Sequence, residues 1–157
     1  MALKSDIETL EKIPDRGRAV FLIIFNKDNS KILMLKRNAK KRNLWKTSWG
    51  NIGGKIDPGE SSSEAIIREA FEEIGIKFNE ESLSLLHIKE VPHARKNWHP
   101  IHFFYGTSIE ENEIIKINSE SDEYSWFNIE NLPEDMFDSM GFILNLKSIF
   151  CSSDNKT

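Results

Sequence analysis

An uninterrupted apolar run near the N-terminus constrains the fold of this chain more than any other feature. Residues 18–26 read RAVFLIIFN, with seven consecutive apolar side chains from Ala19 to Phe25. The run is far shorter than the roughly 20 residues that a membrane helix needs. Short continuous apolar runs are typical of strands that are covered on both faces. We therefore expect a buried strand here, inside a layered sheet.

Turn signals divide the rest of the chain into further elements. Lys27–Ser30 is rich in turn-forming residues, so we expect a hairpin that leads into a second strand at Ile32–Leu35. Later elements follow from the spacing of apolar residues. The expected strands are Leu83–Val91, His102–Ser108, Glu113–Ile117 and Tyr124–Asn128, and the expected helices are Asp6–Lys12, Ser61–Ile74 and Glu134–Phe150. This order predicts one α/β domain over residues 1–157 with a mixed sheet, frayed at 1–15 and 151–157.

Charge and cysteine content exclude several classes of function. The net charge is −4 and the pI is about 5.6, so the chain lacks the basic field that holds a nucleic acid duplex. An acidic protein can still bind phosphates where a divalent cation supplies positive charge. The one cysteine, Cys151, excludes an intrachain disulfide and a cysteine-based zinc site. The charged stretch 1–15 is unlike a signal peptide, so we expect a cytoplasmic protein with no membrane partner.

A dense basic segment follows the second expected strand. Residues 36–46 hold six cationic side chains, which are Lys36, Arg37, Lys40, Lys41, Arg42 and Lys46. Most such runs are solvated loops. This one could instead face a polyphosphate, and the run itself leaves both interpretations open.

The expected helix Ser61–Ile74 has an apolar side and an acidic side. Ser61 and Glu64 can form a capping box at its start, and Gly75 can end it. The apolar side is made of Ile66, Ile67, Ala70, Phe71 and Ile74, and the acidic side of Glu69, Glu72 and Glu73. Neighbouring carboxylates repel one another unless a cation lies between them, and Mg²⁺ prefers such oxygens. A metal site and a solvated acidic face both remain open from the helix alone.

The wider pattern favours the metal site. Gly54 is followed after five residues by Glu60 and after seven more by Arg68, and residues 68–76 read REAFEEIGI. This resembles the Nudix box, G-x5-E-x7-R-E-U-x-E-E-x-G-U with U apolar, at every fixed letter and at both U positions. The resemblance implies a Nudix α/β/α sandwich with a mixed β-sheet between helices. It also implies metal-dependent hydrolysis of a phosphoanhydride in a nucleoside diphosphate derivative.

The resemblance assigns roles to the residues of the box. It implies Mg²⁺ (or Mn²⁺) as the cofactor, held by Glu72, Glu73 and the carbonyl of Gly54. Glu69 is a further ligand or the base that deprotonates the attacking water, and we favour it as the base. Glu60 and Arg68 are expected to pair as a structural brace between the loop and the helix, with Arg68 counted in the catalytic set.

Two further stretches resemble the MutT-type branch, which hydrolyses purine nucleoside triphosphates, especially oxidised ones. Residues 49–56 read WGNIGGKI, and an acidic stretch at 120–123 precedes Trp126 and Leu132–Pro133. In that branch, an acidic residue at the position of Glu120 joins the metal site, so Glu120 enters the expected metal and catalytic sets with Glu69 and Glu73. A solvated acidic loop is the alternative. The branch implies a (deoxy)nucleoside triphosphate that is cleaved to monophosphate and pyrophosphate.

The substrate contacts are less sharply defined. We expect phosphate contacts from Lys36, Arg37 and Lys55, and base contacts from Phe137 and Asp138, although Phe137 also fits an ordinary core position. His102 could line the cleft or be structural. One alternative is an ADP-ribose or nucleotide-sugar pyrophosphatase, since Pro92 lies near the spacing typical of ADP-ribose hydrolases. Another is a non-catalytic nucleotide-binding module. We expect a monomer or homodimer.

Overall fold

The computed structural model describes residues 17–91 and 100–136. Four features of the sequence analysis lie outside these residues: the helix expected at Asp6–Lys12, Pro92, the base contacts Phe137 and Asp138, and Cys151. Most of the helix expected at Glu134–Phe150 lies outside them as well. Its described start is not helical, because Met136 forms an isolated parallel bridge with Trp49.

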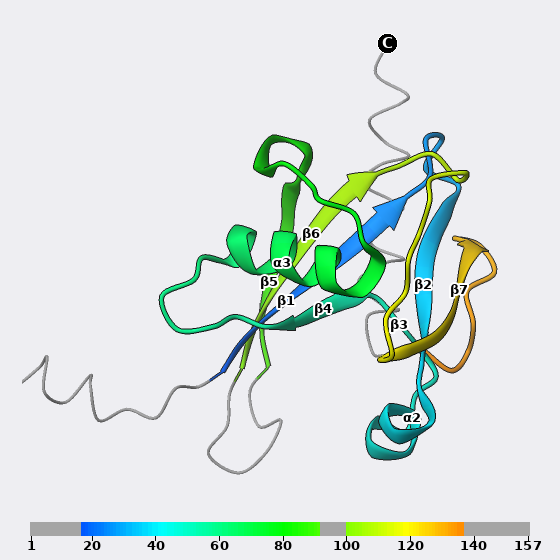
Figure 1. Ribbon diagram of the computed structural model, residues 1–157, viewed down its shortest axis with the longest axis horizontal. Helices are drawn as coiled ribbons and strands as arrows, with labels where there is room; N and C mark the ends of the chain where they lie inside the picture. Colours follow the sequence, from blue (N-terminus) through cyan, green and yellow to red (C-terminus); the bar gives the residue numbers. More distant parts are fainter. Residues whose placement is uncertain (1–16, 92–99, 137–157) are drawn as a thin grey trace, which may run out of the picture.

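A mixed seven-stranded sheet forms the centre of the molecule (Figure 1). Five of the strands lie in the order β3-β2-β1-β6-β5. In addition, β4 pairs with β1, and β7 pairs with β2. β1 is parallel to β6 and antiparallel to β2 and β4. The strands are β1 Arg18–Phe25, β2 Lys31–Arg37, β3 Trp49–Gly50, β4 Ile52–Lys55, β5 Ser84–Glu90, β6 Ile101–Ser108 and β7 Ser121–Asn128.

The apolar run forms β1, and the expectation that it is covered on both faces is confirmed. Side chains alternate across a strand, so β1 contributes to two separate cores. Val20, Leu22 and Ile24 are buried in one core with residues of α3, the helix Ser62–Ile74. Ile23 and Phe25 are buried in the other with side chains of β2 and of residues 129–136.

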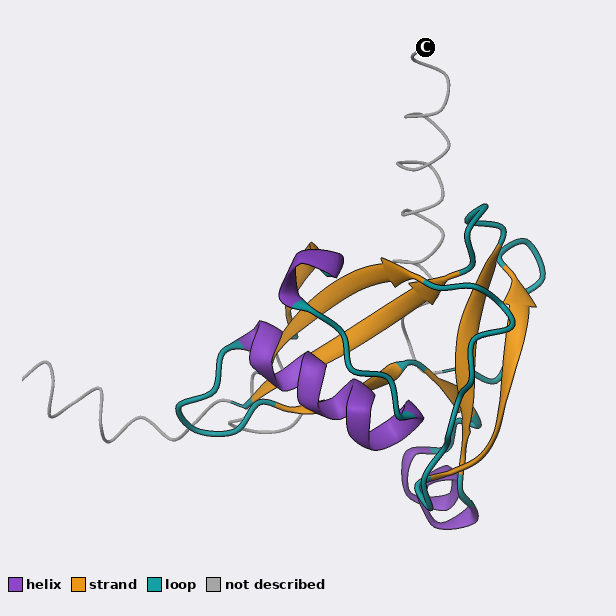
Figure 2. Ribbon diagram, turned by 45° about the horizontal axis from the view of Figure 1, so that its top comes forward, coloured by secondary structure: helices purple, strands orange, loops and turns teal. Residues whose placement is uncertain are grey.

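The helix α3 packs across one face of the sheet (Figure 2), against β1 and β4. Both ends match the sequence expectation: Ser61 and Glu64 form the capping box, and Gly75 ends the helix in the left-handed conformation. The expected apolar face is corrected at one position, because Phe71 is 57% exposed at the edge of the packed stripe. Glu73 is buried instead.

The basic segment contains a short helix that the loop expectation missed. α2 spans Ala39–Trp45, and its N-cap Asn38 accepts a hydrogen bond from the backbone N–H of Lys41. Few apolar residues mark this helix, which explains why the charge pattern obscured it. A 3-10 helix, η1, spans Glu80–Ser82. None of the helices in residues 17–91 and 100–136 combines the length and apolar character that a membrane-spanning helix requires.

The strand expected at Glu113–Ile117 is wrong. These residues have no regular secondary structure and run beside the C-terminal end of α3. The backbone N–H of Lys116 donates to the carbonyl of Ile74, and the Asn118 side chain donates to the carbonyl of Glu72. The Lys116 N–H and the Asn118 side chain therefore donate to carbonyls at the end of α3 and do not pair with a neighbouring strand. This path places Glu120 in the lining of one cavity with Gly54 and Glu73 of the expected box.

Candidate active site

Two adjacent glycines allow the acidic side of α3 to touch β4. The Gly53 N–H donates to Oε2 of Glu73 at 2.9 Å. A Cβ on Gly53 would collide with the Val20 carbonyl oxygen and lie 2.8 Å from the Phe21 ring. A Cβ on Gly54 would collide with the carboxylate of Glu69. The glycines therefore let two carboxylates of α3 approach the backbone of β4.

Arg68 connects the loop before α3 to the acidic side of the helix. Its Nε and Nη2 donate to the two carboxylate oxygens of Glu60, each at 2.9 Å. Nη2 also donates to the Lys55 carbonyl at 3.1 Å, and Nη1 to Oε1 of Glu69 at 2.9 Å. The pair expected between Glu60 and Arg68 is thus formed. These hydrogen bonds hold the pKa of Glu60 at about 2, and they fix the orientation of Glu69.

Burial and like charges act on the carboxylates of α3. Burial raises the pKa of Glu73 to about 8, against the lowering effect of the Gly53 N–H, and the charges of Glu69 and Glu120 add to the rise. Burial also raises the pKa of Glu69, although the hydrogen bond and charge of Arg68 oppose this. Glu72, by contrast, has a side chain that is 52% exposed. The three glutamates of the acidic side therefore lie in three different environments.

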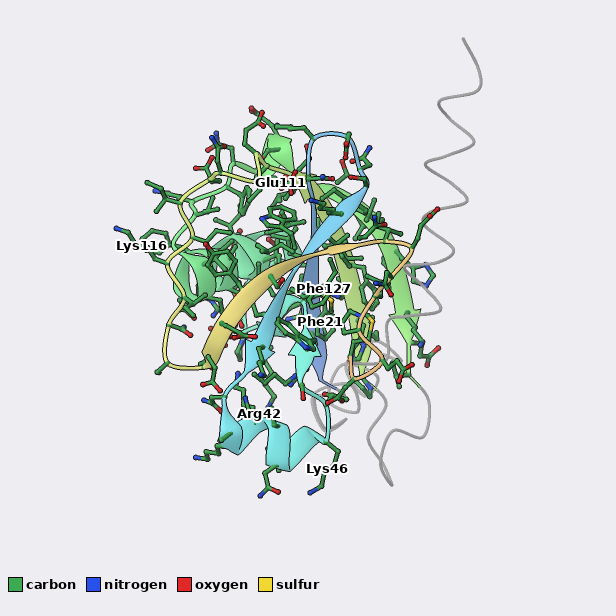
Figure 3. The ribbon with its side chains drawn as sticks, turned by 90° about the vertical axis from the view of Figure 1, so that its right-hand side faces the viewer. Phe21, Arg42, Lys46, Glu111, Lys116 and Phe127 are labelled. Atoms are coloured by element: carbon green, nitrogen blue, oxygen red, sulfur yellow. The ribbon has the colours of Figure 1, made fainter. Side chains whose placement is uncertain are left out.

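Glu120 reaches the site from the segment before β7. Its N–H donates to the Asn118 side chain, and its carbonyl accepts from the N–H of Asn38. Its side chain accepts a hydrogen bond from Nζ of Lys41 at 3.1 Å. Lys41 lies on α2. Figure 3 labels Arg42 and Lys46 of this region and shows that α2 lies at the end of the molecule opposite Glu111.

A cavity of about 430 Å³ opens beside these residues. Its lining includes polar and glycine residues, which are Gly53, Gly54, Glu73, Glu120, Arg37 and Lys41. It also includes apolar and aromatic residues, which are Ala19, Phe21, Val91, Pro100 and His102. The Phe21 and His102 rings meet edge to face with centroids 5.0 Å apart, and burial lowers the pKa of His102. The cavity thus offers acidic, cationic and aromatic groups within one space.

The expected substrate contacts separate in the structure. Arg37 and Lys55 line the cavity, and Arg37 lies close to Gly50, whose Cβ would be 3.1 Å from Nη2. Lys36 does not line it, and its Nζ lies 3.9 Å from Glu123. Sequence reasoning missed Phe21 and Lys41 as cavity residues. The alternation of β1 could have placed Phe21 on the face opposite α3, but no sequence signal distinguished Lys41 from its basic neighbours.

The oxygen donors of the site suit a divalent cation by their chemistry, although they are not gathered around one point. Among residues 17–91 and 100–136, no three acidic, histidine or cysteine side chains are gathered as a complete ligand set for one ion. The chemistry of the available donors nevertheless fits Mg²⁺, which prefers few carboxylates and keeps several waters. Glu69, Glu73 and Glu120 act on one another as like charges, and a bound cation would offset that repulsion. The exposed Glu72 is the least enclosed of the expected ligands.

Comparisons with known proteins agree with this geometry. A family model described as NUDIX domain matches residues 15–144. An ADP-ribose pyrophosphatase of Methanocaldococcus jannaschii is 33% identical over 73% of this chain and 64% of its own length. A dihydroneopterin triphosphate diphosphatase of Haemophilus influenzae is 27% identical over 70% of this chain and 73% of its own. A crystal structure of a MutT NUDIX hydrolase from Burkholderia pseudomallei is similar at a TM-score of 0.67, with 23% identity, covering 82% of this chain and 95% of that one. This chain therefore spans just under two thirds of the archaeal relative.

Proposed function

This chain belongs to the NUDIX domain family, and from that premise we propose that it is a Mg²⁺- or Mn²⁺-dependent pyrophosphohydrolase of nucleoside diphosphate derivatives. One observation carries the proposal. The carboxylates of Glu69 and Glu73 are held against the backbone of Gly54 and Gly53, and Glu73 lines a cavity together with Glu120, Arg37 and Lys41. Cleavage of a phosphoanhydride depends mainly on positioning and charge neutralisation, which such a site can provide.

The residues of the site divide the work of hydrolysis. Glu73, Glu120 and the Gly54 carbonyl would hold the metal, with Glu72 as a more exposed ligand. The bound cation would neutralise phosphate charge and make water a better nucleophile. Glu69 accepts the proton of the attacking water as that water adds to phosphorus, and the bridging oxygen leaves with the other phosphate group. Arg68 holds the Glu69 carboxylate in place through its 2.9 Å hydrogen bond.

The mixed lining of the cavity favours a substrate that carries both phosphates and a flat ring. Arg37 and Lys55 are cationic residues of the lining that can contact phosphate oxygens. Phe21 and His102 add aromatic rings to the same lining, which suits contact with a base. We propose a (deoxy)nucleoside triphosphate, possessing a normal or oxidised purine, as the substrate. The products are then the monophosphate and pyrophosphate.

A second candidate substrate is ADP-ribose or a nucleotide sugar. The archaeal relative that is 33% identical carries the name ADP-ribose pyrophosphatase. Like a nucleoside triphosphate, such a substrate contains a phosphoanhydride and a nucleobase. It carries a sugar in place of the terminal phosphate. The cationic residues of the lining would then meet a neutral group beyond the diphosphate.

A substrate panel with product analysis tests both candidates. Purified protein with Mg²⁺ or Mn²⁺ is incubated with nucleoside triphosphates, their oxidised purine forms, ADP-ribose and nucleotide sugars. Pyrophosphate released together with a monophosphate supports the first candidate. Two monophosphates from ADP-ribose, with no pyrophosphate from triphosphates, support the second. Nucleotide binding without turnover of any compound would contradict both and favour the non-catalytic module.

A further inference from the structure

Lys41 occupies a position that the hydrolytic scheme does not use. Its ammonium group is 3.1 Å from Oε1 of Glu120, and both side chains line the 430 Å³ cavity with Glu73. The charge of Lys41 also acts on Glu73, where it favours the ionised carboxylate. The ammonium group of Lys41 therefore lies among the carboxylates that would bind the metal.

The backbone around this ion pair is fixed, so only the side chains are free to exchange partners. Asn38 caps α2, and its N–H and side-chain amide donate to the carbonyls of Glu120 and Ser119, both at 3.0 Å. Arg42, one residue after Lys41, pairs with Asp122 at 2.6 Å. The start of α2 and residues 118–122 are therefore tied together on both sides of the pair. The Lys41 side chain itself is 35% exposed, and its ammonium group is carried on a flexible stem of four carbons.

We propose that Lys41 is a positioning residue that exchanges Glu120 for a substrate phosphate when a metal ion binds. In the free protein, Lys41 neutralises Glu120 and competes with the metal for that carboxylate. When a cation occupies Glu120, repulsion between the two positive charges displaces the ammonium group. The same cavity then offers it the phosphates of the nucleotide. This inference rests on the proposed function, since it assumes that Glu120 belongs to the metal site.

The exchange makes metal and nucleotide binding cooperative. Without nucleotide, metal binding must break the pair between Lys41 and Glu120 and leaves the ammonium group without a counter-charge. With nucleotide present, a phosphate supplies that counter-charge. Each ligand should therefore bind more tightly when the other is present, and linkage requires the two increases to be equal.

Electron paramagnetic resonance of Mn²⁺ tests this without any turnover. The variant Lys41→Met keeps the length of the side chain and removes the charge. In the absence of nucleotide, we expect it to bind Mn²⁺ about two- to fivefold more tightly than wild type, the range expected for loss of a partly exposed ion pair. A non-hydrolysable nucleoside triphosphate should raise the Mn²⁺ affinity of wild type. We expect this nucleotide-dependent increase to be smaller in Lys41→Met by a similar factor. The nucleotide itself should bind more weakly to the variant at saturating Mn²⁺.

Lys40→Met is the matched control, because it removes the same charge from the adjacent, exposed position of α2, outside the cavity lining. It should leave both Mn²⁺ affinities at the wild-type values. If Lys41→Met fails to fold, Lys41→Gln gives the same comparison. Equal Mn²⁺ affinity for Lys41→Met and wild type without nucleotide would overturn the proposal, even if wild type is an active hydrolase. A wild type with tight, nucleotide-coupled Mn²⁺ binding but no turnover would instead overturn the proposed function alone.

Discussion

At the scale of single residues, the site depends on two neighbouring glycines that are needed for different reasons. The space beside Gly53 is filled by the Val20 carbonyl and the Phe21 ring, which belong to the paired backbone of β1. The space beside Gly54 is filled by the Glu69 carboxylate, the far end of a flexible side chain. An added methyl group at Gly53 must therefore displace the backbone of β1, whereas one at Gly54 displaces the carboxylate of Glu69.

Alanine substitutions at the two positions should separate stability from activity. We expect Gly53→Ala to lower the free energy of unfolding by about 1–3 kcal/mol through overpacking. Gly54→Ala should lower it by about 0.5–1.5 kcal/mol, because moving the Glu69 carboxylate breaks its hydrogen bond from Arg68. It should nevertheless reduce kcat/KM about 100-fold, because it displaces the Glu69 carboxylate. Urea unfolding and steady-state kinetics measure the two effects. Full activity in folded Gly54→Ala would show that the placement of Glu69 is irrelevant to the reaction.

The pair between Glu60 and Arg68 predicts a specific acid sensitivity. The Arg68 hydrogen bonds lower the pKa of Glu60 from 4.5 to about 2 in the folded protein. The unfolded chain therefore binds the proton first as the pH falls, so the stabilisation is complete above about pH 4.5 and lost towards pH 2. Glu60→Gln should be less stable than wild type at pH 7, and the difference in unfolding free energy should narrow between pH 4.5 and pH 2.

Denaturant unfolding of both proteins across that pH range checks this. Glu81→Gln, which alters an exposed glutamate of η1, is the matched control and should follow wild type throughout. A constant difference between Glu60→Gln and wild type down to pH 2 would contradict the assigned role of the ion pair.

At the scale of elements, α3 is the part whose boundaries the sequence determines most fully. The hydroxyl of Ser61 accepts from the N–H of Glu64 at 3.1 Å, and Gly75 donates to the Phe71 carbonyl. We expect Ser61→Ala to lower the free energy of unfolding by about 1 kcal/mol, because an N–H at the start of the helix loses its partner. Ser61→Asp, which retains an N-cap acceptor, should restore most of this in thermal unfolding. Equal losses for both variants would show that the cap is not the source of the effect.

Elements with weak apolar periodicity were the ones that sequence reasoning misjudged. α2 was hidden in a basic run, since its charge pattern resembles that of a solvated loop. Glu113–Ile117 contains three isoleucines, which are typical of strands, yet the Lys116 N–H donates to the Ile74 carbonyl at the end of α3. The helix wheel placed Phe71 on the apolar side, but its side chain is 57% exposed in the folded protein. In each case, tertiary contacts decided what local pattern could not.

At the scale of the whole molecule, the site is assembled from segments that are distant in sequence. β4 and α3 carry the box residues, which were predictable together because they lie within one continuous motif, although no strand was expected at Ile52–Lys55. Lys41 and Glu120 meet only because β7 pairs with β2 and brings its preceding segment to the start of α2. Phe21 and His102 meet only because β1 and β6 are parallel neighbours. Spacing along the chain carries no information about such pairings, so the reaction class was predictable and the cavity was not.

The central claim is that the carboxylates held against β4 perform phosphoanhydride hydrolysis, and turnover by Glu73→Gln tests it most directly. Gln keeps the shape of Glu73 and an oxygen that can accept from the Gly53 N–H. Because burial raises the pKa of Glu73 to about 8, removing the charge should not destabilise the metal-free fold at pH 7.5. We predict a folded variant whose kcat on the best substrate of the panel is at least about 100-fold below wild type. A folded variant with wild-type kcat would contradict the account.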